Sequence, residues 1–220
     1  MTLDKLVIKE REDKIRSLGL DPDKILRRLP SSQLPSIERI DEAIEYFKNE
    51  LGFTNKQFQS QPALLISSIE DNIKPKVEYY KNELSFDNKQ FQSNPNLINY
   101  SIEDTIKPKV KYFKNELGFS NKQFQRNPSL LTNSIENNVK PKVEYFKNEL
   151  GFKNKQFQSN PALFGYSLEK RIKPRTEFLR IKQINVPSYF LSLRDELFCK
   201  NLAKCSLEEY QSFKDDYLKK

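Results

Sequence analysis

The sequence predicts an all-α solenoid built from helical repeats of about 33 residues, and three observations carry this prediction. A 33-residue unit recurs four times, starting at Gly52, Ser85, Gly118 and Gly151. Each unit carries two prolines at fixed positions and one helical stripe of apolar residues. Apolar residues make up only 36% of the chain, which suits an extended array in which each unit contacts only its neighbours.

We expect a single solenoid domain over residues 1–220. It is divided into an irregular N-terminal repeat (1–51), four regular repeats (52–180) and a divergent C-terminal cap (181–220). The irregular repeat contains a degenerate copy of the unit, at residues 18–30 and then 37–51. One repeat cannot bury its apolar stripe alone, so stacked repeats are expected to share a continuous core, closed by end caps with a polar outer face.

Each regular repeat is expected to open with a short helix. Thr54-x-x-Gln57 and Ser120-x-x-Gln123 match the capping box, in which the glutamine bonds back to the residue before the helix. Pro62 then ends this helix, and the ALLI segment can add one further turn. The recurring phenylalanines of this half of the repeat are expected in the core: Phe53, Phe86, Phe119, Phe152, Phe58, Phe91, Phe124 and Phe157.

A longer helix is expected to follow the short one. Its apolar residues are spaced by 4, 4, 3 and 4 positions, the pattern of one helix face: Ile69, Ile73, Val77, Tyr80 and Leu84. Tyr79, Tyr112 and Tyr145 lie beside this stripe. We expect these tyrosines to pack between repeats rather than to stack on bases.

The two ends of the longer helix carry their own signals. Ser68 with Asp71 three residues later resembles a helix start. Gly118 and Gly151 follow the last apolar residue, where a left-handed residue ends a helix. Pro75 leaves two alternatives, because the helix either begins near residue 74 or runs through the proline with a bend. The unbroken stripe favours the bent helix.

Several classes of protein are excluded by what the chain lacks. It has no histidine, the commonest general base and metal ligand. Cys199 and Cys205 have a spacing that fits no zinc or redox motif, so we interpret them as reduced thiols. There is no glycine-rich phosphate loop or nucleophile elbow. We therefore expect no enzyme, no cofactor, no metal and no small-molecule substrate.

Membrane insertion and import signals are also not evident. No apolar run approaches the 18 residues that a membrane-spanning helix requires, so we expect no membrane partner. The first residues, MTLDKLVIKEREDK, mix acids with bases and match neither a signal peptide nor a transit peptide.

The repeat resembles the mitochondrial transcription termination factor (mTERF) family. The shared pattern is a leucine-glycine-aromatic start, a short helix, N-P-x-L-[LI], S-[IL]-E and then [IV]-K-P-[KR]-V-E-[FY]. The strongest match is FGYSLEKRIKPR at residues 164–175, which resembles the signature that opens the C-terminal part of many members. The resemblance covers roughly residues 14–200. The chain departs from the family pattern in its short length and in the close similarity of its repeats.

The resemblance implies a left-handed solenoid curved like a half-ring, although the repeat pattern alone leaves a right-handed one open. It also implies binding of double-stranded DNA in a basic groove, or of structured RNA such as ribosomal RNA. Family members work in mitochondria or chloroplasts, so we expect a mitochondrial protein, with the chloroplast as the alternative. Outside a larger assembly we expect a monomer.

Positive charge increases toward the C-terminal repeats. The net charge is −1 over residues 1–51, 0 over 52–84, +1 over 85–117, +2 over 118–150, +5 over 151–180 and +1 over 181–220. A positive field attracts a phosphate backbone and makes binding sensitive to salt.

Cations at repeat spacing are the candidate phosphate contacts. The predicted nucleic-acid-binding residues are Lys74, Lys76, Lys107, Lys109, Lys140, Lys142, Lys170, Arg171, Lys173 and Arg175. A weaker candidate set is Lys56, Lys89, Lys122 and Lys155. The alternative for both sets is that these side chains are the solvated edges of apolar helix faces.

Variation between repeats concentrates in one dipeptide. It reads Ile66-Ser67, Asn99-Tyr100, Thr132-Asn133 and Gly165-Tyr166 in successive repeats. We hypothesise that it lies at a turn facing solvent or a ligand; the favoured alternative is drift in an unconstrained loop. Elsewhere the near-identical repeats suit contacts with a nucleic-acid backbone, which position without specifying sequence.

The leading functional prediction is an organellar nucleic-acid-binding protein that binds duplex DNA in transcription or its termination. The first alternative is a protein that binds ribosomal RNA, as a component or assembly factor of an organellar ribosome. The second alternative is a protein–protein scaffold, which the near-neutral first half of the chain favours.

Overall fold

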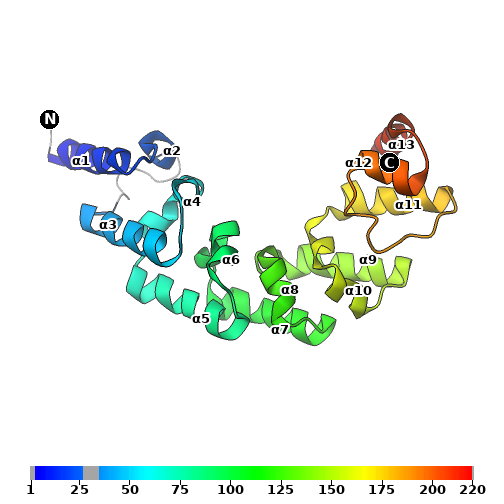
Figure 1. The fold of residues 1–220 in the computed structure, drawn as a ribbon, viewed down its shortest axis with the longest axis horizontal. Coiled ribbons are helices and arrows are strands. Elements are labelled where there is room, and N and C mark those ends of the chain that lie inside the picture. The colour runs from blue at the N-terminus through cyan, green and yellow to red at the C-terminus, as the bar shows by residue number, and fades with distance from the viewer. Residues whose placement is uncertain (1–2, 27–34, 220) are drawn as a thin grey trace. The chain divides into compact units, whose positions relative to one another are not determined.

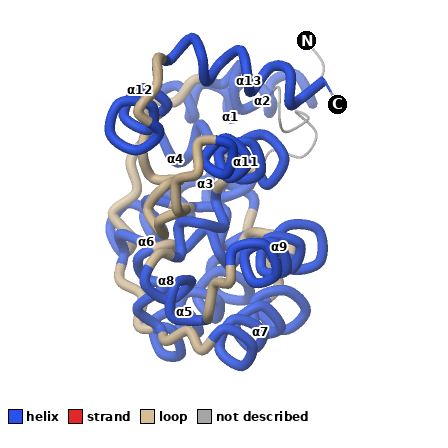
Figure 2. Tube along the Cα trace, turned by 90° about the vertical axis from the view of Figure 1, so that its right-hand side faces the viewer, coloured by secondary structure: helices blue, strands red, loops and turns tan. Residues whose placement is uncertain are grey.

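The computed structural model describes residues 3–26 and 35–219 of the chain, and over these residues the regular structure is helical (Figures 1 and 2). The second part of the predicted segment 18–30 lies outside the described residues. The chain divides into two compact units, residues 1–107 and residues 108–220. Each unit is described by itself.

The first unit begins with the irregular repeat and continues into the regular ones. Its α-helices are α1 (Leu3–Ser17), α2 (Pro22–Leu26), α3 (Ile37–Glu45), α4 (Asn55–Ser60), α5 (Lys74–Leu84) and α6 (Asn88–Ser93). Tighter 3₁₀ segments cover Pro62–Ile66 and Pro95–Asn99, and wider π-helical turns cover Tyr46–Glu50, Ile69–Ile73 and Ile102–Ile106.

The second unit repeats the same order and ends in the cap. Its α-helices are α7 (Lys107–Leu117, whose first residue ends the first unit), α8 (Asn121–Arg126), α9 (Lys140–Leu150), α10 (Asn154–Ser159), α11 (Lys173–Ile181), α12 (Asp195–Leu197) and α13 (Leu207–Lys219). The 3₁₀ segments are Pro128–Leu131 and Pro161–Gly165, and the π-helical turns are Ile135–Val139, Leu168–Ile172 and Phe198–Ala203. These repeated helix pairs confirm the predicted all-α repeat architecture.

The short helices start with the predicted capping box. In α4 the Gln57 side chain accepts a hydrogen bond from the backbone N–H of Thr54, at 2.9 Å. In α8 the Gln123 side chain accepts the same bond from Ser120, also at 2.9 Å. Each short helix ends two residues before the proline that begins the 3₁₀ segment.

The longer helix runs through its proline without a break. Ser68 caps it by accepting a hydrogen bond from the N–H of Asp71, and helical residues then continue from Ile69 to Leu84. The turn before Pro75 is a π turn, in which the N–H of Ile73 bonds to the carbonyl of Ser68, at 3.1 Å. A wider turn fits here because proline has no N–H to donate and its ring clashes with an α-helical carbonyl four residues earlier. Of the two alternatives for Pro75, the continuous helix is therefore correct.

A left-handed residue ends each longer helix, as predicted. Gly118 and Gly151 have φ values of 66° and 64°. Ser85 takes the equivalent place in the second repeat with a φ of 55°, although a side chain there costs energy that glycine avoids.

Three aromatic rings form the core of each repeat. In the first unit Phe47 stacks on Phe53 with ring centroids 5.3 Å apart and meets Phe58 edge-on at 6.1 Å. In the second unit Phe146 and Phe152 stack at 5.1 Å. All the phenylalanines predicted to be in the core are buried. Such pairs add about 0.5–1.5 kcal/mol beyond the burial of their area.

Glutamine amides join one repeat to the next. In the second unit the Gln123 side chain donates to the backbone carbonyl of Gln158, at 3.0 Å. The Gln158 side chain donates in return to the carbonyl of Leu117, at 2.8 Å. These bonds satisfy carbonyls at helix ends that would otherwise lack a partner.

Gly118→Ala is expected to destabilise the protein more than Gly151→Ala. Both residues have a positive φ, so each substitution costs about 1 kcal/mol through the backbone. Only at Gly118 would the added Cβ meet another atom, the Gln158 amide nitrogen at 2.7 Å, whereas nothing lies within 4 Å at Gly151. Urea unfolding of the two variants measures the difference. Equal losses of stability would contradict this role of Gln158.

Candidate nucleic-acid interface

The second cation of each K-P-K or K-P-R motif points into the protein. The Lys76 ammonium donates to the carbonyl of Ile98, at 3.0 Å, in the next repeat. In the second unit Lys109 donates to Leu131, at 2.9 Å, and Lys142 to Phe164, at 2.7 Å. Lys142 is only 4% exposed. Burial lowers the pKa of all three lysines.

Arg175 occupies the same position at the last repeat and is fully buried. Its guanidinium donates to the carbonyl of Phe190 at 2.6 Å and to the Asp195 carboxylate at 2.5 Å. It also lies over the ring of Phe198, 4.4 Å from the centroid. The side chain therefore fastens the C-terminal cap to α11.

The prediction that these four cations contact phosphate does not fit the burial of Lys142 and Arg175; Lys76 and Lys109 are half-buried, and each already donates to a backbone carbonyl. Residues two positions apart on a helix point about 200° away from each other. The two cations of one motif consequently face opposite sides, and the second of them faces the adjacent repeat. The inward-facing set is Lys76, Lys109, Lys142 and Arg175.

The first cation of each motif remains at the surface beside a carboxylate. Lys74 pairs with Glu70, four residues earlier, and equivalent pairs join Lys107 to Glu103, Lys140 to Glu136 and Lys173 to Glu169. The hydrogen bond from the lysine to its glutamate raises the pKa of each of these lysines. Exposed pairs of this kind contribute little to stability, so a phosphate can exchange for the glutamate at small cost.

The tyrosines beside the apolar stripe pack between repeats, as predicted. Lys107 lies over the ring of Tyr79, 5.7 Å from its centroid, and Lys140 lies over Tyr112, at 6.0 Å. Both tyrosines are half-buried. Each ring thus supports the surface lysine of the following repeat through a cation–π contact.

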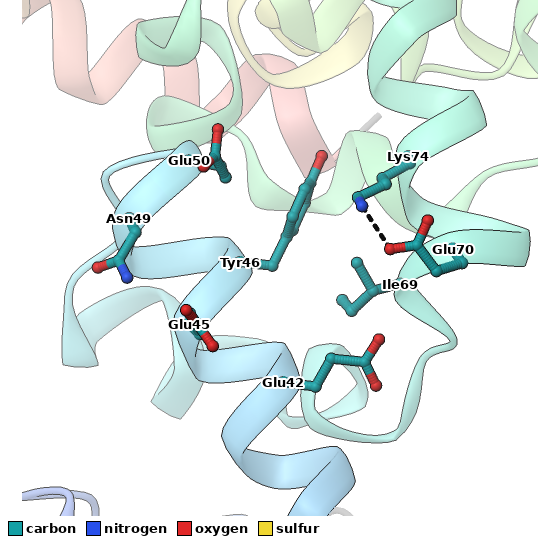
Figure 3. A pocket seen from close by; sticks show the side chains of 8 residues that line it. All are labelled: Glu42, Glu45, Tyr46, Asn49, Glu50, Ile69, Glu70 and Lys74. Atoms are coloured by element: carbon teal, nitrogen blue, oxygen red, sulfur yellow. Dashed lines mark hydrogen bonds and ion pairs between the residues drawn. The ribbon is translucent and has the colours of Figure 1, made fainter.

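Lys74, the surface lysine of the first regular repeat, lies in an acidic pocket. The Tyr46 side chain lies between Glu50 of its own helix and Lys74 of the next repeat (Figure 3). Glu42, Glu45 and Glu70 complete the acidic lining of the pocket. Burial raises the pKa of Tyr46 to about 12, with a smaller contribution from the negative charges of Glu50, Glu78 and Glu70. Lys74 is therefore outnumbered by negative charges, which disfavours phosphate binding there.

The position of Lys170, one of the predicted nucleic-acid-binding residues, changes its charge along the repeats. The third residue of the longer helix is Asp71, Asp104, Asn137 and Lys170 in successive repeats. Asp71 and Asp104 each accept a hydrogen bond from the serine that caps their helix, at 3.1 and 2.8 Å. Lys170 is exposed. This change of charge can be found from the sequence alone, by aligning the repeats at their 33-residue spacing.

Arg171 has a mixed role. Its guanidinium donates to the carbonyls of Leu191 and Leu193 in the cap, at 3.0 and 2.7 Å. It also lies over the ring of Tyr166, 4.9 Å from the centroid. Arg171 is only half-buried, so it adds positive charge at the surface beside Lys170 while it holds the cap.

The two units differ sharply in net charge. Residues 108–220 carry 22 basic and 12 acidic side chains, for a net charge of +10. Residues 1–107 carry 16 basic and 18 acidic side chains, for a net charge of −2. The candidate interface therefore belongs to the second unit and includes Lys140, Lys170, Arg171 and Lys173.

The short helices carry a second set of surface cations. Lys56, Lys89, Lys122 and Lys155 are exposed, one on each of α4, α6, α8 and α10. Over the described parts of the chain these four lysines form no ion pair. They share one place in the repeat, so they provide evenly repeated positive charge rather than a site unique to one repeat.

Neither a metal centre nor a membrane helix emerges from residues 3–26 and 35–219. Over these residues no group of histidine, cysteine, aspartate and glutamate side chains is arranged to hold a metal ion. No helix there is both long and apolar enough to cross a bilayer.

Comparison with known proteins identifies a family. A family model described as mTERF matches the chain in two stretches, residues 2–116 and residues 109–201. No curated protein matches the sequence.

Lys142→Met is expected to lower the free energy of unfolding by about 1–3 kcal/mol, because it leaves the Phe164 carbonyl and the Asn138 side-chain oxygen without their donor. Lys140→Met, two residues earlier, removes only an exposed ion pair and is expected to change stability little. Thermal and urea unfolding of the two variants compare them. A Lys142→Met protein as stable as the wild type would refute the inward role of this lysine.

Proposed function

Because the chain belongs to the mTERF family, we propose that it binds double-stranded DNA in an organelle and acts in transcription or its termination. Proteins of this family are non-catalytic nucleic-acid-binding proteins of mitochondria and chloroplasts. We place this chain in the mitochondrion, with the chloroplast as the alternative.

The observation that carries the proposal is the net charge of +10 on residues 108–220. A duplex holds condensed counterions, and their release when cations replace them drives binding. Lys170 and Lys173 lie within one turn of the same helix, so both side chains reach one stretch of backbone. Lys173 exchanges its bond to Glu169 for a bond to phosphate.

Two other functions fit particular observations. A ribosomal-RNA-binding protein would use the same exposed lysines, because RNA and DNA present the same phosphates; the 2′-hydroxyl and groove widths distinguish them. A protein–protein scaffold is favoured by the net charge of −2 on residues 1–107 and by the acidic pocket around Tyr46.

Titration with nucleic acids separates these functions. The protein is titrated with duplex DNA, duplex RNA and single strands of matched sequence at two salt concentrations. We expect the tightest binding to duplex DNA, with an affinity that falls linearly with salt on logarithmic axes. A preference for RNA supports the ribosomal alternative, and no binding at low salt leaves the scaffold.

Lys170→Asp is expected to weaken duplex binding several-fold at low salt and to lower the salt slope by about one. It places in the fourth repeat the residue that the first repeat carries as Asp71, so the helix start should be preserved. Lys56→Asp, an equal charge change at an exposed site in the first unit, is the matched control and should cost less. Equal losses for the two variants would contradict the assignment of binding to the second unit.

A further inference from the structure

The same pocket forms at two junctions between repeats, one in each unit. The first inter-repeat pocket is lined by Asp71, Asn72 and Lys76 of one repeat and by Asn99 and Ser101 of the next. The second inter-repeat pocket is lined by the residues 66 positions later: Asn137, Asn138, Lys142, Gly165 and Ser167. Their cavity volumes are about 630 and 520 Å³, within the roughly 300–1,000 Å³ typical of ligand pockets.

The scaffold of these pockets is constant, and two polar positions on it vary. Asn72, Lys76 and Ser101 have identical counterparts in the second pocket. Asp71 is replaced by Asn137, and Asn99 by Gly165. Residues 99 and 165 are the first members of the variable dipeptide. The variation thus lines a pocket at both junctions.

The inward-facing lysines hold this variable segment in place. Lys76 bonds to the carbonyl of Ile98, and Lys142 bonds to the carbonyl of Phe164. Each carbonyl belongs to the residue immediately before the variable dipeptide. The variable side chains therefore project from a fixed backbone, as a recognition site requires.

Hydrogen-bonding capacity differs between the two pockets. In the second pocket Asn137, which replaces Asp71, has a carboxamide whose NH₂ group can donate. In the first pocket Asp71 has only carboxylate oxygens, one of which already accepts from Ser68. Base edges that present acceptors, such as guanine O6 and N7, match the second pocket. Edges with an amino group, on cytosine or adenine, match the first.

A base fits these linings better than a phosphate does. Glu103 lines the first pocket and Glu169 lines the second, and a carboxylate repels a phosphate at close range. Beside the second pocket, Arg171 over Tyr166 and the exposed Lys170 supply the positive charge that holds the backbone outside.

We propose that the second inter-repeat pocket contacts a nucleobase edge and that Asn137 and Gly165 set the base preferred at one position of the bound site. The inference rests on the proposed function, since it requires that nucleic acid binds. The inference names residues that would discriminate between nucleic-acid sequences. Contacts to the nucleic-acid backbone cannot make this discrimination.

The test converts one pocket into the other. Asn137→Asp with Gly165→Asn gives the second pocket the polar residues of the first, leaving a leucine–isoleucine difference at residues 168 and 102. Gly165 tolerates a side chain, because nothing lies within 4 Å of an added Cβ. Wild type and variant each select from a randomised pool of the nucleic acid that the titration shows to bind best.

The expected result is a change at one position of the selected sequence. Wild type should prefer guanine there, and the double variant should prefer cytosine or adenine by about ten-fold, the size of one good base contact. Asn148→Asp is the matched control, because it adds the same charge to an exposed site on α9 away from the pocket, and its selected sequence should match that of wild type.

The outcomes distinguish this inference from the function on which it rests. Binding to nucleic acid with the same selected sequence for wild type and double variant overturns the inference alone. A wild type that binds but selects no preferred sequence overturns it as well. A protein that binds no nucleic acid at low salt overturns the proposed function and this inference together.

Discussion

The structure depends on a bond between a lysine side chain of one repeat and a backbone carbonyl of the next. Lys76 and Lys142 each reach a carbonyl 22 residues later, at the end of the following 3₁₀ segment. A short 3₁₀ segment leaves carbonyls unpaired, and a buried unpaired carbonyl costs about 1–3 kcal/mol. The ammonium satisfies such a carbonyl and thereby fixes the spacing between neighbouring repeats. The apolar stripe of each helix is buried because its neighbour is held in this register.

The π turn before the proline belongs to the same arrangement. Pro75 and its copies cannot donate a backbone hydrogen bond, so the helix widens before each of them and still continues to its glycine or serine end. The motif around the proline then carries two cations on opposite sides of the helix. Lys74 remains at the surface, while Lys76 turns toward the next repeat. The Lys-Pro-Lys tripeptide therefore provides one cation at the surface and one that bonds to the next repeat.

Function enters through the few positions at which the repeats differ. The cations that face the next repeat bond to its backbone carbonyls or to the cap, so their recurrence is explained without a ligand. The change from Asp71 to Lys170 and from Asn99 to Gly165 alters charge and cavity lining on an unchanged scaffold. Under the proposed function, a repetitive protein of the mTERF family would hold a polyanion with residues 108–220 and present different polar groups at its two inter-repeat pockets.

The sequence by itself determined the repeat, the caps at the helix ends and the core, whereas the path of the longer helix through Pro75 needed the structure. The 33-residue period, the capping boxes such as Thr54 with Gln57, and the left-handed Gly118 depend on interactions between residues close in the chain, which the order of residues reveals directly. The tertiary structure decided which cations face solvent. Lys142 and Arg175 look like phosphate ligands in the sequence, but their partners lie 22 and 15 residues away in neighbouring segments. Only the stacking of repeats places a carbonyl or a carboxylate within reach of them.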